Sequence, residues 1–454
     1  MDRTVKTRPM APGTRILKAT VVILGVLILI GGALTIPFKF ESSSMFYKFG
    51  LDKIVLRTAK MVGITAAVLL LLQLPLAGRL KWMDKIFSLP GLYRIHRLNA
   101  YAIGALVLIH PVLIKVADHS WTIPLEKRYW PEWIGAVLMT IVLLHIGFSR
   151  WRRRLFKAYR NWRWTHGALA VAVFSGLVLH ILNVSESFGS SSPPRTWLMT
   201  AALAPGLFWI WLRTERLRSR KQAFRVSRVA AAGSDAYVVD LVPAAPPGID
   251  YLPGQFALLS IESPHISGEF HPFTISSSPS RPAMIQFTIR CCGDWTRRIG
   301  AVREADRACM QGPYGRFSHL FLRPDREIIM IAGGIGITPM LSMLRFMNDH
   351  GDPRPITLIW SNRTPAHLFG SHELEAMQEK LTGFKWVPIF TREAPGDHQV
   401  GRLDEKALKM LLGHCGRDAA VFLCGPPAMV AQIRVDLKRI GFHRKSVHTE
   451  AFGF

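Results

Sequence analysis

Six apolar stretches are the feature that most limits what this chain can fold into. Each is long enough to cross a bilayer as a helix, and they cover roughly residues 16–37, 57–78, 96–117, 132–149, 163–184 and 196–213. The first is longer than the apolar region of a signal peptide and lacks a small-residue cleavage site, so we expect it to be retained. The sequence therefore predicts a six-helix transmembrane bundle in residues 1–217.

Basic residues indicate how this bundle is oriented. The chain has 57 Lys and Arg against 31 Asp and Glu, a formal net charge of +26. The bases concentrate in the loops between the second and third helices, between the fourth and fifth, and after the sixth. The positive-inside rule then predicts a multi-pass protein of the cell membrane with both termini cytoplasmic. Because the bases adjoin apolar spans, the lipid bilayer explains them better than a nucleic acid does.

From about residue 218 the sequence changes to short strands, Gly/Pro turns and amphipathic helices. Residues 236–244, 255–261 and 284–290 have the composition of β-strands. After residue 323 the pattern becomes strand, glycine turn, helix and strand, which is typical of a parallel sheet. We expect an antiparallel β-barrel domain in residues 218–322 and a doubly wound α/β domain in residues 323–454. All five cysteines lie after residue 290 without zinc-ligand spacing, which favours a reducing compartment.

Two histidine pairs stand inside the predicted membrane helices. His96 and His110 lie 14 positions apart in the third helix, and His166 and His180 repeat this spacing in the fifth. Fourteen residues bring both rings to nearly one face of a helix, about 21 Å apart along its axis. The third and fifth helices run in the same direction, so His96 should face His166 and His110 should face His180. Facing imidazoles can ligate a haem iron, which predicts two b-type haems; the alternative is that each histidine only bonds a neighbouring helix. His145, in the fourth helix, has no partner at this spacing and is expected to be structural.

The remaining chain contains three segments suited to nucleotide cofactors. Residues 268–279, GEFHPFTISSSP, end a strand with hydroxyl side chains that can donate to a flavin. Gly293–Thr296 are expected to open a helix whose backbone N–H groups suit a pyrophosphate. Residues 332–340, AGGIGITPM, place glycines between a strand and a helix, where a dinucleotide can approach closely, although they do not form the G-x-G-x-x-G fingerprint.

Five motifs in this order give the chain a resemblance to a known family. HPFTISSSP, IRCCGDWT, GPYGRFS, AGGIGITPM and FLCGPPAM resemble the catalytic subunits of NADPH oxidases, within the wider ferric reductase and ferredoxin-reductase-like families. The likeness covers the third to sixth helices through their histidines, and residues 218–454. It implies a ferredoxin-reductase-like module with FAD in the β-barrel and NADPH, or alternatively NADH, in the α/β domain.

The resemblance also implies roles for individual residues. FAD would contact His271, Pro272, Phe273, Thr274 and Ser276, with Arg290 at its phosphate and Gly293, Trp295 and Thr296 at its pyrophosphate. The nicotinamide cofactor would contact Gly333, Gly334, Gly336, Thr338, Pro339, Gly425 and Pro426, with Arg363 near the 2′-phosphate. Cys424 would lie by the nicotinamide ring. Phe452 would cover the flavin, although two further residues follow it, which leaves the choice between Phe452 and Phe454 open.

Together these expectations describe a transmembrane oxidoreductase that passes electrons from cytoplasmic NADPH through FAD and two haems to an acceptor on the outer face. Dioxygen, giving superoxide, is the favoured acceptor; a ferric chelate, a quinone or an external partner protein are alternatives. A haem-free, membrane-anchored flavoreductase is the alternative of another class. A transporter is disfavoured, because the sequence shows neither broken helices nor a P-loop. No EF-hand loop or docking tail is recognisable, so no obligate regulatory subunit is expected.

Overall fold

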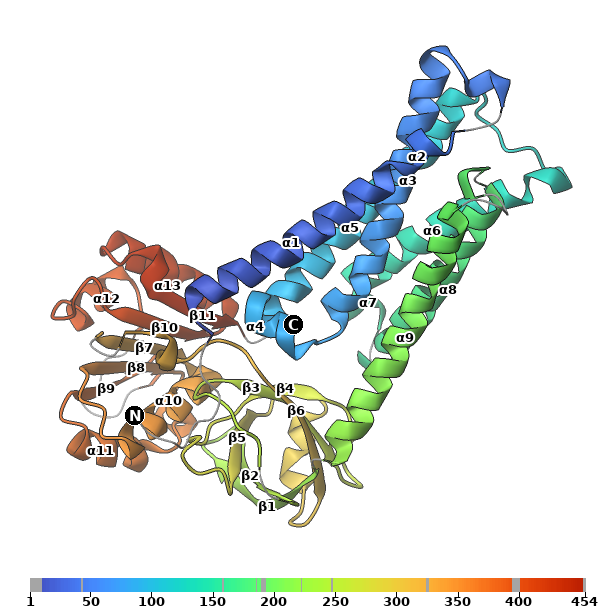
Figure 1. Cartoon of the computed structure of the whole chain (residues 1–454). Coiled ribbons are helices and arrows are strands. Elements are labelled where there is room, and N and C mark those ends of the chain that lie inside the picture. Colours follow the sequence, from blue (N-terminus) through green and yellow to red (C-terminus); the bar gives the residue numbers. More distant parts are fainter. Residues whose placement is uncertain are drawn as a thin grey trace. The chain divides into compact units, whose positions relative to one another are not determined.

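The computed structural model describes residues 10–41, 44–156, 159–184, 186–188, 193–221, 223–245, 248–323, 326–393 and 401–451. The chain divides into two compact units, one spanning Pro12–Thr214 and the other containing Glu215–Phe454. The first unit is helical, and the second holds both β-sheets (Figure 1). The domain boundaries drawn from the sequence, after residues 217 and 322, stay predictions.

Five helical segments in the described part of the first unit are long and apolar enough to cross a membrane. They are α1 with α2 (Pro12–Leu34, Ile36–Lys39), α3 (Gly50–Ala77), α5 (Leu89–Ala117), α6 with its preceding turn (Lys127–Arg150) and α8 (Tyr159–Val184). The sixth predicted stretch lies in one continuous helix, α9 (Pro193–Lys221), which is not among these five. Three tryptophans, Pro205 and Gly206 stand among its aliphatic residues and lower the mean hydropathy of the helix. The sixth membrane span therefore stays a prediction.

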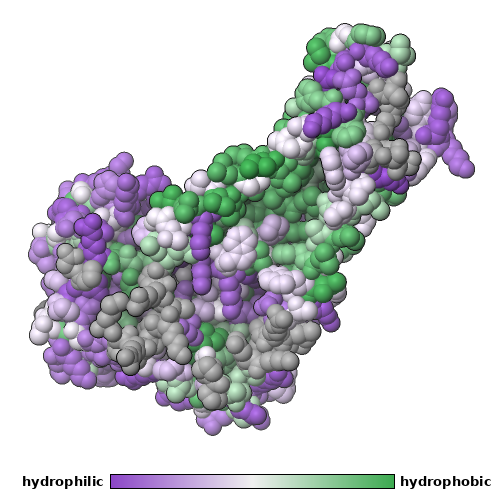
Figure 2. Space-filling model, viewed as in Figure 1, coloured by the Kyte–Doolittle hydropathy of each residue, from purple (hydrophilic) through white to green (hydrophobic). Residues whose placement is uncertain are grey.

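The membrane helices pack as two neighbouring pairs. Helix α3 lies along α5 and helix α6 lies along α8 (Figure 1), and α5 also contacts α6. Each of the four helices contributes one buried residue to a shared apolar cluster, namely Leu70, Ile103, Val142 and Val173. By contrast, α1 has no buried residue, and Figure 2 shows hydrophobic side chains along its surface. Such an apolar surface suits lipid.

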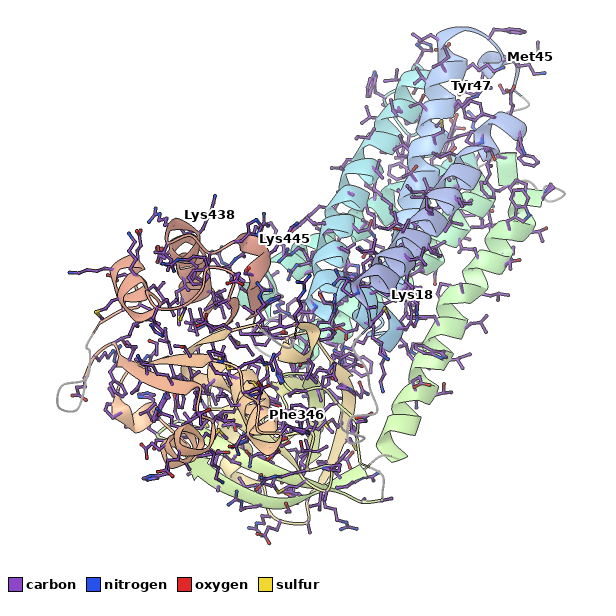
Figure 3. The ribbon with its side chains drawn as sticks, turned by 60° about the vertical axis from the view of Figure 1, so that its left-hand side comes forward. Lys18, Met45, Tyr47, Phe346, Lys438 and Lys445 are labelled. Carbon is purple, nitrogen blue, oxygen red and sulfur yellow. The ribbon has the colours of Figure 1, made fainter. Side chains whose placement is uncertain are left out.

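The two ends of the helical unit are marked by short connecting elements. Met45 and Tyr47 belong to a 3₁₀ turn (Met45–Tyr47), and Figure 3 shows them at the opposite end of the unit from Lys18 of α1. Tyr47 donates a hydrogen bond to Asp118, which directly follows α5. The start of α5, preceded by α4 (Lys81–Phe87), is therefore at the other end.

The first sheet of the second unit is an antiparallel barrel. Its order is β4-β3-β6-β1-β2-β5, built from β1 (Ala223–Ala232), β2 (Ala236–Pro243), β3 (Phe256–Glu262), β4 (His271–Thr274), β5 (Ile285–Arg290) and β6 (Arg307–Tyr314). Just beyond β4, Ile275 bridges to Phe287 of β5, and the Ser276 N–H donates to the Gln286 carbonyl at 2.8 Å. These contacts join the two edge strands and confirm the predicted antiparallel β-barrel.

The second sheet is parallel and covered on both faces. Its order is β11-β10-β7-β8-β9, with β7 (Ile328–Gly333), β8 (Ile356–Asn362), β9 (Phe384–Phe390), β10 (Ala420–Gly425) and β11 (Val447–Ala451). Alternate residues of β7 pack with α10 (Thr338–Asp349) and α11 (Ser371–Lys380) on one face, and with α12 (Glu405–Leu411) and α13 (Pro427–Arg439) on the other. This arrangement confirms the doubly wound fold. The strand order reverses between β7 and β10, which places a ligand crevice at the carboxyl ends of these strands.

Candidate functional sites

The predicted histidine pairs define two levels in the helical unit, which we call the His96 level and the His110 level. At the His96 level, the imidazoles of His96 on α5 and His166 on α8 have ring centroids 6.4 Å apart, with the ring planes tilted by 58°. These two rings are not hydrogen-bonded to each other, and the Nδ1 atom of His96 is buried without a partner. The 14-residue spacing predicted that His96 faces His166, and the two rings approach each other from different helices.

The separation of these two rings fits a shared iron atom. Two metal–nitrogen bonds of about 2.0 Å, plus about 1.1 Å from each nitrogen to its ring centre, give a centroid distance of about 6 Å. Within the described residues no group of three or more His, Cys, Asp and Glu side chains forms a metal site. A haem iron needs only two axial protein ligands, so His96 and His166 have the donor set that a haem requires.

A third imidazole completes the His96 level. His145 on α6 lies with its Nε2 atom 2.7 Å from Nδ1 of His166, and Ser149 Oγ lies 3.1 Å from the same nitrogen. Both partners engage Nδ1, so Nε2 of His166 is left to face His96. A hydrogen bond on the outward ring nitrogen is the usual way in which a metal-binding histidine is oriented. The spacing argument gave His145 no partner, because the contact crosses between two helices.

At the His110 level, the outward ring nitrogen of each histidine is hydrogen-bonded to a backbone carbonyl. Nδ1 of His110 lies 2.9 Å from the Ala59 carbonyl on α3, and Nδ1 of His180 lies 3.4 Å from the Pro131 carbonyl on α6. A carbonyl oxygen only accepts hydrogen bonds, so each Nδ1 carries the proton and each Nε2 is the unprotonated nitrogen that can bind a metal. The donor set at this level also fits axial ligation of a haem iron.

An apolar layer separates the two levels. Ile103 is midway between His96 and His110 on α5, and Val173 is midway between His166 and His180 on α8. Both side chains are at most 3% exposed and belong to the shared cluster with Leu70 and Val142. The two levels are thus distinct sites, about 21 Å apart along α5.

The predicted flavin residues form an aromatic group on the barrel. Phe273 of β4 stacks on Trp295 with ring centroids 5.6 Å apart, and His271 lies 4.6 Å from the same indole. Burial lowers the pKa of His271 below its ordinary value, although the nearby Glu269 charge acts in the opposite direction. Nε2 of His271 is buried and makes no hydrogen bond with a described residue, and the Glu269 carboxylate lies 3.8 Å from it. This nitrogen can still donate to or accept from a polar ligand beside the two aromatic rings. Pro272 and Thr274 belong to the same strand.

Two other predicted flavin contacts have partners within the protein. The hydroxyl of Ser276 is buried, donates to the Gln286 carbonyl at 3.1 Å and lies 3.2 Å from Thr288 Oγ1. Thr296 Oγ1 accepts hydrogen bonds from the backbone N–H groups of Cys292 and Gly293, each at 2.9 Å. Thr296 opens a 3₁₀ helix (Thr296–Ala301) where the sequence indicated a helix start. The Thr296 hydroxyl therefore stabilises the turn that presents this segment.

The glycine turn after β7 meets the end of β10. A Cβ atom on Gly336 would lie 2.3 Å from the Cys424 carbonyl oxygen, and one on Gly425 would lie 3.1 Å from Gly333. Gly334 has φ of +53°, a conformation that favours glycine. The turn thus packs against the backbone of Cys424, whose side chain is fully buried in the core and does not line the cavity, and burial raises the pKa of its thiol well above the ordinary value. Thr338 and Pro339 begin α10 directly after the turn.

A cavity at the carboxyl ends of the parallel strands is lined by four of the predicted nicotinamide residues, Gly333, Gly334, Arg363 and Pro426, and not by Gly336, Thr338, Pro339, Cys424 or Gly425. Its lining comes from both sheets and includes Asp235, Arg290, Gly333, Gly334, Arg363, His367 and Pro426. Arg290 makes an ion pair with Asp235 in which Nε, at 2.7 Å, and Nη2, at 2.6 Å, both donate to the same carboxylate oxygen, Oδ2. A Cβ atom on Gly334 would lie 3.3 Å from Arg290 Nη1. The structure therefore places Arg290, which the resemblance assigns to the flavin phosphate, at the nicotinamide crevice as well.

Arg363 projects from the end of β8 into the same cavity. Its side chain is exposed and has no ion pair with a described acidic residue. His367 lines the cavity nearby, with Nδ1 2.9 Å from Thr364 Oγ1. A guanidinium that opens into a cavity and pairs with no described acidic residue suits a phosphate group. Phe452, the predicted flavin cover, lies outside the described residues, as do Gly453 and Phe454.

Several residues at these sites were not found from the sequence. Asp235 and His367 carry no motif of their own, and His145 contacts His166 only across helices. Gly63 and Gly135 adjoin the rings of His110 and His180. Each of these glycines follows, by four residues, the carbonyl that bonds the histidine, a relation that exists only once the helices have packed.

Three families match successive parts of the chain. Residues 62–177 match the ferric reductase like transmembrane component, residues 222–318 match a FAD-binding domain, and residues 330–434 match an oxidoreductase NAD-binding domain. The first match contains three of the four predicted haem ligands, and the fourth, His180, lies just after its end. The other two matches contain the barrel and most of the parallel sheet.

Individual proteins also resemble this chain. The propane 2-monooxygenase reductase component of Rhodococcus jostii (strain RHA1) is 30% identical over 220 residues, which are 45% of this chain and 56% of that protein. The glycine betaine monooxygenase reductase subunit of Pseudomonas aeruginosa (strain UCBPP-PA14) is 29% identical over 212 residues, again 45% and 56%. The chain thus spans about half the length of these curated relatives. Among solved structures, the FAD/NAD-binding domain of a nitric oxide dioxygenase from Vibrio cholerae matches at 19% identity with a TM-score of 0.46, covering 51% of this chain and 99% of that one.

Proposed function

Because this chain has the ferric reductase-like architecture, a transmembrane component followed by FAD-binding and NAD-binding domains, we propose that it carries electrons across a membrane. It is an NAD(P)H-dependent oxidoreductase, and in the proposal it takes electrons from NADPH in the cytoplasm and delivers them to an acceptor on the outer face. The His96 level is then the inner one and the His110 level the outer one. The basic loops support this orientation.

The observation that carries the proposal is the meeting of His96 and His166 with ring centroids 6.4 Å apart. A membrane anchor for a flavoreductase does not need two imidazoles that face each other between helices. Intramembrane ionisable groups are costly and mark functional sites. The same 14-residue spacing on both helices predicts a second pair, His110 with His180, which supports two equivalent cofactors in the proposal.

The chain's own residues hold and orient the cofactors. His96 with His166 and His110 with His180 would hold two haems, the group at β4 and Trp295 would flank FAD, and the crevice at Gly334 would receive NADPH. When bound, FAD accepts a hydride from the nicotinamide and haem carries single electrons. Arg363 would bind the 2′-phosphate, and Cys424, whose backbone packs against the turn containing Gly336, would lie by the nicotinamide ring.

The proposed acceptor is dioxygen, with superoxide as the product. Each haem would be held by two histidines, so the acceptor would take its electron at the edge of the cofactor and would not bind its iron. A ferric chelate satisfies the same geometry. A reductase that supplies a separate partner protein is the second candidate, and the names of the relatives as reductase components of monooxygenases favour it.

The proposal is tested by measuring where the electrons leave. In proteoliposomes supplied with NADPH on the cytoplasmic face, we expect cytochrome c reduction on the other face that superoxide dismutase suppresses. Ferric chelate reduction insensitive to the dismutase would indicate the alternative acceptor. The His110→Leu variant should lose outer-face reduction and keep NADPH-dependent flavin reduction; surviving outer-face activity would contradict the role of His110.

A further inference from the structure

Two glycines on facing helices touch the two histidines of the His110 level in the same way. A Cβ atom on Gly63 of α3 would lie 2.9 Å from Cε1 and 3.0 Å from Nδ1 of His110. A Cβ atom on Gly135 of α6 would lie 2.6 Å from Cε1 and 3.0 Å from Nδ1 of His180. Both contacts involve the same ring edge, and both are closer than a Cβ atom tolerates.

Each glycine stands four residues after the carbonyl that its histidine uses. Ala59 precedes Gly63, and its carbonyl bonds His110; Pro131 precedes Gly135, and its carbonyl bonds His180. In a helix, a side chain leans toward the N-terminus and covers the preceding turn, where the carbonyl four residues earlier lies. A glycine at this position leaves that carbonyl open to a second donor.

We propose that Gly63 and Gly135 are positioning residues for the two outer haem ligands, an inference that rests on the proposed function. By exposing the Ala59 and Pro131 carbonyls, they let each imidazole approach the helix backbone and donate from Nδ1. The donated proton fixes the tautomer, so Nε2 is directed to the iron. The two glycines thereby act on the same haem from opposite helices.

At the His96 level no glycine of the described helices adjoins an imidazole ring. His166 is held by the side chains of His145 and Ser149, and the His96 ring lies by the backbone of Gln73, where the residue four positions later is Ala77. A Cβ atom on other glycines of the bundle would meet other groups, such as Ile146 Cδ1 at 3.0 Å from Gly104 and the Phe208 ring at 2.4 Å from Gly78. The glycine–imidazole contact is thus specific, within the described helices, to the His110 level.

The test is the number of haems that each full-length variant retains per FAD, measured by the pyridine haemochrome assay and by released flavin. We expect two haems for the natural protein and one each for His166→Leu and His110→Leu. Adding Gly63→Ala or Gly135→Ala to His166→Leu should remove the remaining haem. Adding either glycine substitution to His110→Leu should leave one haem, because the inner pair is untouched. FAD content shows in each case that the reductase unit is folded.

Two control substitutions separate this effect from general packing. Gly104→Ala tests a crowded glycine of the same bundle, and Gly25→Ala tests an exposed glycine of α1 with nothing within 4 Å. Both should retain the haem in either background. As a second measurement, electron paramagnetic resonance of Gly63→Ala alone should change or remove only one of two low-spin ferric signals.

The outcomes distinguish the two proposals. A natural protein with FAD but no haem would overturn the proposed function and this inference with it. A natural protein with two haems, in which Gly63→Ala and Gly135→Ala keep both haems and both resonance signals, would overturn the inference alone. Loss of the inner haem on Gly63→Ala would also overturn it, since the glycine would then support the whole bundle.

Discussion

Replacing Arg363 with alanine should change which nicotinamide cofactor the protein prefers. The Arg363 side chain opens into the cavity at the end of β8 without an ion pair to a described acidic residue. We expect its guanidinium to bind the 2′-phosphate, which NADPH has and NADH lacks. Arg363→Ala should therefore weaken the use of NADPH and leave NADH almost unaffected.

The size of this effect follows from the exposure of the site. A hydrogen bond to a charged group contributes about 1.5–3 kcal/mol, and solvent screening of an exposed side chain favours the lower part of that range. Since about 1.4 kcal/mol corresponds to a factor of ten, the ratio of kcat/KM for NADPH to that for NADH should fall about tenfold. His367 in the same cavity limits the loss if it shares the phosphate.

The assay is stopped-flow reduction of the bound flavin by each cofactor. The matched control is Lys385→Ala, which removes one positive charge near the start of β9, at the edge of the sheet opposite the carboxyl ends of the strands. Arg363→Lys should recover part of the preference for NADPH. An unchanged ratio in Arg363→Ala, or an equal loss with NADPH and NADH, would refute the assignment.

Three further predictions concern buried groups. Burial, assisted by the nearby Arg354 charge, lowers the pKa of His319 to about 3. Below pH 6.5 the unfolded chain therefore binds more protons than the folded protein, and the free energy of unfolding should fall by up to about 1.4 kcal/mol per pH unit on acidification. The melting temperature, followed by FAD fluorescence, should drop less between pH 7 and 5 in His319→Phe than in the natural protein, and an equal drop would contradict this reasoning. His145→Leu should leave Nδ1 of His166 to Ser149 alone and shift one low-spin ferric resonance signal without loss of FAD; unchanged spectra would remove His145 from the site. Cys424 is a buried thiol whose pKa is raised, so it should resist iodoacetamide in the folded protein at pH 8, whereas the exposed Cys292 should react. Mass spectrometry measures the labelling of each cysteine, and equal labelling would place Cys424 in solvent.

The histidine levels illustrate what a sequence reveals about such a protein. The relation between His96 and His110 depends only on the geometry of one helix, so it follows from their spacing. The contact of His145 with His166 depends on how α6 packs on α8, which no spacing within one helix contains. The strand patterns predicted the barrel and the doubly wound sheet, because alternation and glycine turns are local properties.

Gly63 and Gly135 show a second limit. A glycine in an apolar helix has many roles, and its contact with an imidazole exists only once two helices have packed. The sixth membrane span shows a third limit, because α9 is a long helix whose tryptophans, proline and glycine lower its hydropathy without interrupting it. The boundary between an apolar helix and a membrane span is set by the surroundings as well as by composition.

The central claim is that paired histidines in the membrane unit hold haem in electronic contact with the flavin module. The most direct measurement is the visible spectrum of the purified full-length protein during anaerobic titration with NADPH. The account predicts haem absorption at two haems per FAD and reduction of both the flavin and the haem bands. Bleaching of the flavin alone, in a protein without haem absorption, would contradict it.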